Sequence, residues 1–419
     1  MILDIFSELQ KAKPWPPDHE KLLLDEVIEQ AKLADEMGYG CWWNVEHHGA
    51  VEFSYSSTPE FMPVVLGLHT RRMRFGHSGI LAPFKINHPL RVAERAAFAD
   101  LVTGGRMEVG LARSGGTEWT AFGVDAESSR AQLREALLML PRMWTEHSFK
   151  WESPLVSIPE RDVVPKPLQK PHPPLWQTAT SPESFEMAGE LGVGALATTL
   201  LTPLTSLAQL FGFYRKGLAR CQPAGHFVNA QIAVFTFVHC AASKREAIES
   251  RAGEAALWFV NAAPRVFNVP RSVWITQIRG ALRPNAPAAS ATAGGADSEP
   301  DDDLDDPIPV IRLLNRHKAG QNLDPEEVYE VLDGVESVVI GDPDRCRAKM
   351  ERYRQIGTDR LMCLHQFGAL PQARILESIR LVGEHLIPHF ARLGVASSVG
   401  SEWSDRPASA RRAAGERSR

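Results

Sequence analysis

The chain has 419 residues, of which 44% are hydrophobic and 23% charged, with a formal net charge of −5 and a pI near 6.3. This balance is typical of a soluble globular protein with a sizeable core, and it gives no indication of a nucleic-acid partner. The five cysteines include no Cys-x-x-Cys pair, and nowhere do 18 uncharged apolar residues run together, which argues against a disulfide framework, a metal site of the zinc type and a membrane span. We therefore expect a cytoplasmic protein.

Strand-like and helix-like patterns alternate along the chain. Apolar runs predict strands over 2–6, 41–45, 73–81, 106–112, 175–179, 193–198, 230–239 and 360–365. Helical spacing predicts helices over 18–38, 58–69, 87–104, 128–145, 182–191, 203–220, 243–262, 325–332, 342–356 and 371–386. Eight such units fit an α/β fold of the (β/α)8 TIM-barrel type with insertions, in which parallel strands are joined by helical crossovers.

Three segments interrupt this alternation. The aromatic, proline-rich stretch 149–174 predicts a hairpin and loop over one end of the barrel. Residues 281–307 are rich in Ala, Pro, Ser and Gly and end in an acidic run, which predicts a disordered or mobile loop, with a lid as the alternative. The barrel domain is expected over 1–390, and the basic, low-complexity segment 391–419 is predicted to be a disordered tail.

Polar residues cluster directly after the second predicted strand. Glu46, His47 and His48 follow an apolar run and precede a turn at Gly49. The carboxyl ends of barrel strands carry the active site, and two imidazoles beside a carboxylate are suited to proton transfer near neutral pH. Composition alone fits a hydrogen-bonded corner without chemistry equally well.

Two further strand ends carry groups that favour an anion. Arg113 and Ser114 follow the fourth predicted strand and lead into a Ser-Gly-Gly turn. Thr180, Ser181 and Ser184 lie where a helix begins, so free backbone amides and hydroxyl groups meet there. An ordinary helix cap explains Ser181 about equally well. Together the two groups suggest a phosphorylated cofactor.

A family resemblance follows from several motifs taken in order. They cover about residues 1–390 and resemble those of the bacterial luciferase-like flavin monooxygenases. These motifs are Trp43-Asn-Val-Glu-His-His, Gly79-Ile-Leu-Ala-Pro-Phe, Asn87-His-Pro-Leu-Arg-Val-Ala-Glu, Gly105-Arg-Met-Glu-Val-Gly-Leu-Ala-Arg-Ser, Phe122-Gly-Val-Asp, Val164-Pro-Lys-Pro-Leu-Gln-Lys-Pro-His-Pro-Pro-Leu-Trp and Ala179-Thr-Ser-Pro-Glu-Ser.

The resemblance implies a dimeric barrel that binds reduced FMN (FMNH2) from a separate flavin reductase and oxygenates a small organic substrate with O2 through a flavin hydroperoxide. By position, His47 matches the catalytic base and Arg113 the arginine that contacts the FMN phosphate. Ser181 and Ser184, with Thr180 and Ser114 beside these groups, fall at the phosphate-binding segments. Ala82 falls near the strand end that packs on the isoalloxazine ring, and Glu46 and His48 are expected to support His47.

Two other functions remain open at this level. A deazaflavin-dependent oxidoreductase of the same superfamily would transfer hydride without oxygen. A non-catalytic flavin-binding partner subunit would need no catalytic base, and the presence of both His47 and Arg113 argues against this alternative. Whether the oligomer consists of identical or different chains also stays open. The substrate is not determined by the sequence, because loops form its pocket, and we expect specificity to reside in 149–174 and 266–324.

Overall fold

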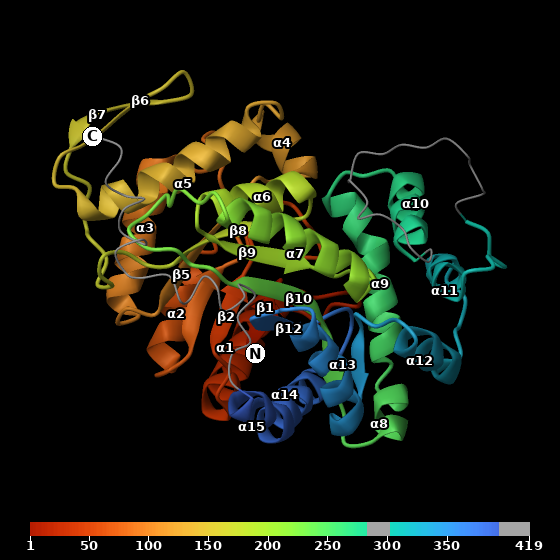
Figure 1. The fold of residues 1–419 in the computed structure, drawn as a ribbon. Helices are drawn as coiled ribbons and strands as arrows, with labels where there is room; N and C mark the ends of the chain where they lie inside the picture. The colour runs from red at the N-terminus through yellow and green to blue at the C-terminus, as the bar shows by residue number, and fades with distance from the viewer. Residues whose placement is uncertain (283–301, 394–419) are drawn as a thin grey trace.

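Parallel strands close into a barrel in the computed structural model, which describes residues 1–282 and 302–393 (Figure 1). Eight positions around the barrel are filled in the order β1-β2-β3-β5-β8-β9-β10-β12, and β12 pairs with β1 to close it. The strands are β1 (Ile2–Ser7), β2 (Cys41–Asn44), β3 (Arg74–His77), β4 (Ile80–Leu81), β5 (Met107–Ala112), β8 (Leu175–Thr178), β9 (Gly194–Thr198), β10 (Ile232–Cys240), β11 (Val339–Gly341) and β12 (Arg360–Leu364). The predicted TIM-barrel class is confirmed.

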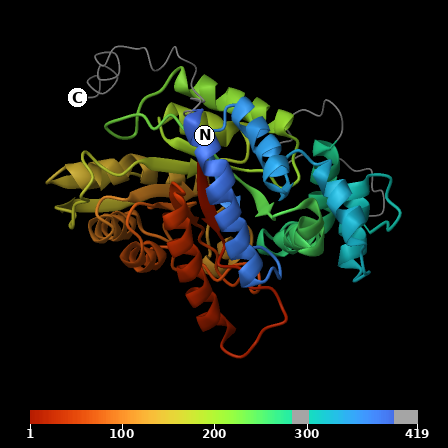
Figure 2. The same cartoon turned by 90° about the horizontal axis from the view of Figure 1, so that it is seen from below.

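Helices surround the barrel on its outer face (Figure 1). They are α1 (His19–Met37), α2 (Phe61–His69), α3 (Pro89–Val102), α4 (Gly116–Phe122), α5 (Ser129–Thr145), α6 (Pro182–Glu190), α7 (Leu204–Leu218), α8 (Lys244–Glu249), α9 (Ala252–Val266), α10 (Arg271–Ala281), α11 (Pro309–Lys318), α12 (Pro325–Asp333), α13 (Pro343–Gln355), α14 (Gln372–Leu381), the π-helical turn η1 (Val382–Leu386) and α15 (Ile387–Arg392). In Figure 2, α1 and the last helices lie side by side, and Gln30 of α1 donates to Gln372 of α14 at 2.8 Å.

Alternating residues of the strands serve two hydrophobic cores. One set packs outward against the helices, and the other, which includes Phe6, Trp43, Trp176, Leu196 and Leu364, faces inward and joins residues of α9. This alternation follows from the period of two along a strand, with both faces of a parallel barrel buried.

Buried ion pairs fix the lower layer of the barrel interior. Arg360 contacts both carboxylate oxygens of Asp4, at 2.7 and 2.9 Å, and the Trp43 indole N–H donates to Asp4 at 2.9 Å. The Trp176 indole donates in the same way to Glu108, at 2.7 Å. These charged groups and indole N–H groups are hydrogen-bonded to one another. We therefore look for reactive side chains above them, at the carboxyl ends of the strands.

Several elements differ from the prediction. The segment 73–81 forms two strands, β3 and β4, and the predicted helix over 243–262 is two helices, because Arg251 takes a left-handed conformation (φ 57°) between α8 and α9. The short strand β11 and the helices α4, α10 and α11 were not predicted. The hairpin β6 (Phe149–Glu152) and β7 (Ser157–Arg161) does form, but it packs on the outer side of α5, where the Trp151 indole donates to Glu135 at 3.1 Å, and not over the end of the barrel.

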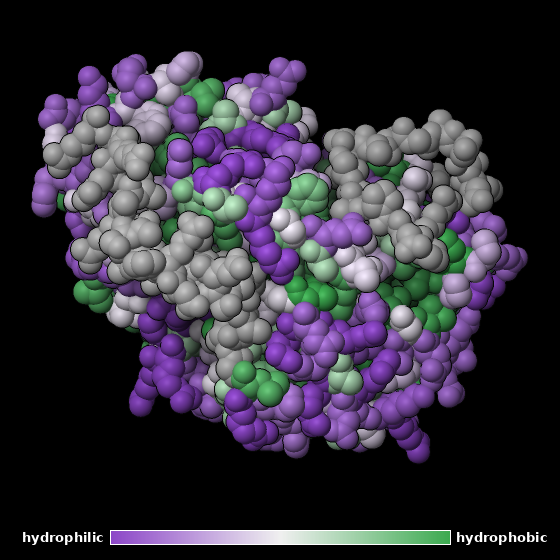
Figure 3. All heavy atoms as spheres, viewed as in Figure 1, coloured by the Kyte–Doolittle hydropathy of each residue, from purple (hydrophilic) through white to green (hydrophobic). Residues whose placement is uncertain are grey.

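The predicted mobile loop and tail fall mostly outside the described residues. Of 281–307, residues 283–301 lie outside, as do 394–419 of the tail. In the described end of the acidic run, Asp306 is buried and pairs with Arg279 at 2.5 Å, and Asp302 pairs with Lys318 at 2.8 Å. In Figure 3, hydrophilic residues are widespread among the coloured atoms of the face, with hydrophobic patches between them. Among the described helices, none has the length and hydrophobicity needed to cross a bilayer.

Candidate active site

His47 lies between two buried carboxylates just beyond the end of β2. Its Nδ1 is 3.1 Å from Oε1 of Glu118, which α4 supplies, and its Nε2 is 3.8 Å from Oε2 of Glu8, which follows β1. The Glu118 oxygen also accepts from the backbone N–H of His48 at 3.4 Å. One acid–base group is therefore built from the residues after β1 and β2 and from α4, and we call it the Glu8–His47–Glu118 trio.

The environment shifts the proton affinity of this trio. Burial raises the pKa of Glu8 to about 7, although the neighbouring His47 opposes that change. Burial by itself would lower the pKa of His47, but the hydrogen bond to Glu118 and the charges of Glu8 and Glu118 outweigh it and raise this pKa above 6.5. His47 is therefore set up to hold a proton, as a donor as well as the base that the sequence suggested.

Glu46 and His48 form a separate contact. Glu46 accepts from the backbone N–H of Leu81 at 2.7 Å and from the Asn87 amide at 2.9 and 3.0 Å, and its Oε1 lies 3.1 Å from Nε2 of His48. The carboxylate thereby ties the loop after β2 to β4 and to the start of α3. The supporting role proposed for Glu46 is consistent with these bonds, which reach His47 only through the backbone.

Aromatic rings and α4 enclose His47. The ring centroids of Phe53 and Phe267 lie 6.2 and 5.9 Å from that of His47, both in edge-on geometry. The Thr117 hydroxyl of α4 donates to the carbonyl of Val266, at the end of α9, at 3.3 Å. Residues after α9 thus meet α4 beside the trio, so the second predicted specificity segment, 266–324, does reach the site.

Arg113 lies at the end of β5 as predicted, among neutral partners. Its Nε donates to the Ser129 hydroxyl at 2.8 Å, and its guanidinium lies 5.1 Å from the ring centroid of Trp119. Burial and the nearby Arg130 lower the pKa of Arg113. The adjacent Ser114 has a left-handed backbone (φ 67°) and a buried hydroxyl for which the described part of the chain supplies no partner. A guanidinium close to a second cation favours an anion.

The residues at the start of α6 form a capping box. The Ser184 N–H donates to the Ser181 hydroxyl at 3.3 Å, and the Ser184 hydroxyl accepts from the N–H groups of Thr180 and Ser181 at 3.0 and 2.9 Å. The helix-cap interpretation of Ser181 is thus correct as geometry, and an anion at this helix start remains a prediction. Ala82 is buried at the end of β4, and its N–H donates to Ala112 beside Arg113 at 2.8 Å.

Four strand ends present buried oxygens without hydrogen-bond partners. Phe6, Trp176, Leu196 and Leu364 face the barrel interior. Two positions later, Thr178 and Thr198 lie on the same face of β8 and β9, and Glu8 and Gln366 follow the ends of β1 and β12. Each of these later residues has a buried side-chain oxygen that lacks a partner among the described residues; they are Glu8, Thr178, Thr198 and Gln366. We call this set the polar ring. Buried polar atoms in native proteins are nearly always paired, so the polar ring fits a ligand rich in hydrogen-bonding groups.

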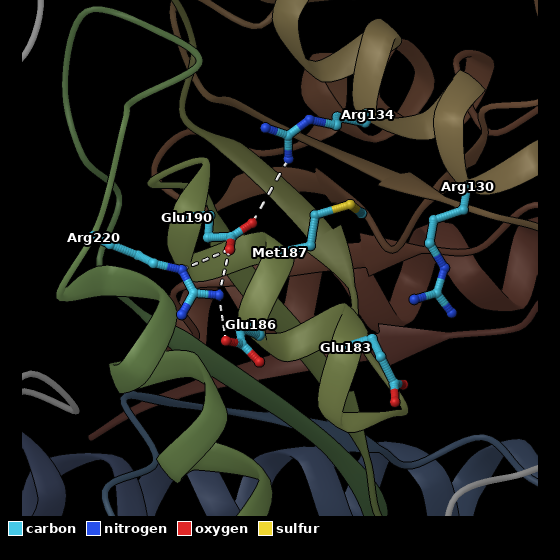
Figure 4. Close-up of a pocket in the computed structure, with 7 residues that line it drawn as sticks. All are labelled: Arg130, Arg134, Glu183, Glu186, Met187, Glu190 and Arg220. Carbon is cyan, nitrogen blue, oxygen red and sulfur yellow. Dashed lines mark hydrogen bonds and ion pairs between the residues drawn. The ribbon is translucent and has the colours of Figure 1, made fainter.

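A charged surface hollow lies on the outer helices and extends to Glu183 at the start of α6 (Figure 4). Arg220 pairs with Glu190 at 2.5 Å there, and Arg134 lies 3.8 Å from Glu190, so its charges are largely matched within the protein. Its lining consists of Arg130, Arg134, Glu183, Glu186, Met187, Glu190 and Arg220. We therefore place the candidate active site at the trio and not at this hollow. Within residues 1–282 and 302–393, no group of three His, Cys, Asp or Glu side chains is arranged to hold a metal ion.

The fold and the trio define an acid–base site at the carboxyl end of a TIM barrel, the usual position of the active site in this class. A model of the family described as luciferase-like monooxygenase matches residues 10–360, and the chain belongs to this family.

Proteins to which this chain is similar in sequence or in fold differ in the cofactor that their names give. The chain is 31% identical over 206 residues, 48% of its length and 56% of the other's, to the oxygenase component of a flavin-dependent trigonelline monooxygenase from Acinetobacter baylyi. The match spans about half of that relative. The oxygenating constituent of 3,6-diketocamphane monooxygenase from Pseudomonas putida, solved with FMN, has a TM-score of 0.67 at 16% identity, covering 93% of this chain and 98% of that one. The coenzyme F420-dependent tetrahydromethanopterin reductase from Methanopyrus kandleri has a TM-score of 0.62 at 18% identity, covering 93% and 100%.

Sequence reasoning assigned no catalytic or binding role to Glu8 and Glu118. Both follow predicted strands, β1 and β5, so their position at strand ends was a usable signal. Their contact with His47 was not visible, because Glu118 is 71 positions away along the chain.

Proposed function

We propose that this protein is the oxygenase component of a two-component monooxygenase that uses reduced FMN from a separate reductase, and O2, to oxidise a small organic substrate. Membership of the family supports the flavin chemistry, and the "oxygenase component" in the name of the trigonelline relative supports a separate reductase. The observation that carries the proposal is the polar ring together with a partly buried His47 that two carboxylates favour in its protonated form.

The polar ring and the strand ends around it fit a flavin. Thr178, Thr198 and Gln366 offer unpaired hydroxyl and amide oxygens to the polar edge of an isoalloxazine ring. Arg113 with Ser114 would hold the phosphate group, together with Thr180, Ser181 and Ser184 at the start of α6. Ala82, small and buried at the end of β4, would lie against the ring.

When bound, reduced flavin supplies the two electrons that reduce dioxygen, with one oxygen atom going to the substrate and the other to water. His47 would hold or release a proton at Nε2, while Glu118 fixes the imidazole through Nδ1. Glu46 and His48 hold the loop that carries His47. Water would be kept away from the imidazole of His47 by Phe53, Phe267 and α4. This exclusion is needed because a reactive oxygen species decays when water has free access to the site.

A titration with reduced FMN under nitrogen tests the cofactor assignment. We expect Arg113→Ala to weaken binding about tenfold or more, because it removes a charge-assisted contact to phosphate. Arg134→Ala is the matched control, since Arg134 lies on the outer hollow and should leave binding unchanged. Equal affinities of the wild type and Arg113→Ala would contradict the assignment of the phosphate site.

A second candidate function is hydride transfer with a deazaflavin. The F420-dependent neighbour shares the fold, and an imidazole held protonated by two carboxylates suits a reaction that delivers a hydride and a proton without oxygen. The same titration with reduced F420 separates the two, because a deazaflavin enzyme would bind it more tightly than reduced FMN.

We further propose a homodimer formed through α2 and α3. Phe61, Val65 and Leu68 recur at helical spacing on α2 and are exposed, as are Phe98 and Leu101 on the adjacent α3. An exposed apolar face of this kind favours a second copy of the chain. Analytical ultracentrifugation of the chain alone, with Leu68→Asp as the disrupting variant, tests this, and turnover by the purified chain alone would exclude a non-catalytic partner subunit.

A further inference from the structure

Glu8 differs from the rest of the polar ring because its side chain can ionise. The residue is 4% exposed, and its Oε2 has no hydrogen-bond partner among the described residues. Its nearest ionisable neighbour is Nε2 of His47 at 3.8 Å, which is beyond hydrogen-bonding distance. A carboxylate oxygen in this position needs a counter-charge that the described protein supplies only in part.

When Glu8 is ionised, the trio has one negative charge more than it has positive charges. Glu118 is hydrogen-bonded to Nδ1 of His47, so an imidazolium there is matched by Glu118. When Glu8 is ionised as well, one imidazolium and two carboxylates give the trio a net charge of −1, and Glu8 is the carboxylate that lacks a hydrogen bond to the imidazole. One further cation at the mouth of the barrel would neutralise it.

Phenyl rings pack together next to His47. Phe53 lies 4.6 Å from Phe259 and 6.4 Å from Phe267, measured between ring centroids. Phe53 is also tied to the segment of Glu8, since the Ser54 hydroxyl donates to the carbonyl of Glu8 at 2.7 Å. Ring faces attract cations, and the attraction is larger where water is excluded.

We propose that Glu8, with Phe53, Phe259 and Phe267, forms a subsite for a substrate that carries a cationic nitrogen, such as an N-alkylated heteroaromatic ring or a protonated amine. This inference rests on the proposed function and names its substrate class. A neutral hydroxyl would fill the hydrogen-bonding gap at Oε2 but would leave the charge unmatched. Without a ligand, Glu8 takes up a proton instead, which agrees with its raised pKa of about 7.

Binding of the 1-methylpyridinium ion, compared with its neutral isostere toluene, tests the subsite. Equilibrium dialysis at about pH 8, where Glu8 is ionised, is carried out with and without oxidised FMN. We expect the wild-type protein to bind the cation about tenfold or more tightly than toluene, and Glu8→Gln to lose that preference. The control variant Glu52→Gln removes a carboxylate that pairs with the exposed Lys13 and should keep the preference.

Equal binding of the two probes by the wild type, an unchanged preference in Glu8→Gln, or no binding of the cation up to about 10 mM would each overturn the subsite. Because Oε2 of Glu8 has no hydrogen-bond partner within residues 1–282 and 302–393, the glutamine variant breaks no bond at this atom and should fold, which its thermal unfolding midpoint verifies. The dialysis does not depend on flavin reduction, so it is separate from the reduced-FMN titration. A protein that prefers the cation but fails to bind reduced FMN would contradict the proposed function alone.

Discussion

Replacing Glu8 by glutamine should change how the stability of the protein depends on pH. Burial raises the pKa of Glu8 from 4.5 to about 7 in the folded protein. Between these values the folded state binds a proton that the unfolded state has lost, so the Glu8 contribution to stability is fully present below pH 4.5 and is lost as the pH rises through about 7. The interval of 4.5 to about 7, at about 1.4 kcal/mol per pH unit, corresponds to roughly 3 kcal/mol.

Glutamine keeps the shape of the side chain but does not titrate. The difference in free energy of unfolding between Glu8→Gln and the wild type should therefore rise, in favour of the variant, by roughly 3 kcal/mol from the acid to the alkaline side of this interval. Urea unfolding followed by tryptophan fluorescence at a series of pH values measures this difference. Taking the difference between variants cancels the titrating groups that do not interact with Glu8, whereas the pKa of His47, which the charge of Glu8 raises, changes together with it.

The matched control is Glu52→Gln, whose carboxylate is partly exposed and paired with Lys13. Its difference from the wild type should stay nearly constant over the same range. A constant difference for Glu8→Gln as well would refute the reasoning, because Glu8 would then be solvated or paired in the folded state and would not be a buried carboxyl group with an unmatched oxygen.

Three other substitutions test separate parts of the site and fold. His47→Ala should lower turnover by about 10²- to 10⁴-fold, as expected for loss of a general acid–base group, with reduced-FMN affinity nearly unchanged, and the reverse pattern in steady-state and binding measurements would assign His47 to binding. Glu118→Gln removes a hydrogen bond to a charged group, worth about 1.5–3 kcal/mol, and should lower the pKa of His47 in an NMR titration; an unchanged pKa would mean that Glu118 does not orient the imidazole. Asp4→Asn leaves the buried Arg360 without its counter-charge and should cost about 3–5 kcal/mol in urea unfolding, whereas a cost below about 1 kcal/mol would show that the pair is solvated.

The barrel was predictable because its signals are local. Apolar runs of four to nine residues mark the strands, and helical spacing marks most of the helices between them. The missed elements have no such signal. The sequence Ser114-Gly-Gly at the start of α4 is typical of a turn, and Ser114 and Gly116 do adopt positive φ. The break between α8 and α9 depends on a single residue, Arg251, which takes a left-handed conformation within a helical pattern.

The candidate site was predictable where residues adjoin a strand end, as His47 and Arg113 do. The sequence could not show that α4 folds back over β2, because this arrangement depends on contacts between α4 and the end of α9, such as that of Thr117 with Val266. That packing brings Glu118 to His47. The role of His47 consequently moved from a lone base to a proton-holding group between two carboxylates.

Oxygen transfer in the presence of isotopically labelled dioxygen tests the central claim most directly. The purified protein is mixed with reduced FMN, ¹⁸O₂ and a panel of aldehydes, ketones, amines, thioethers and N-alkylated heteroaromatic compounds, and the products are analysed by mass spectrometry. A flavin monooxygenase site at His47 predicts a product carrying a single ¹⁸O atom in the wild type and a large loss of that product in His47→Ala. Reduced FMN that binds and is oxidised while no compound of the panel gains ¹⁸O, or equal labelling by His47→Ala, would contradict it.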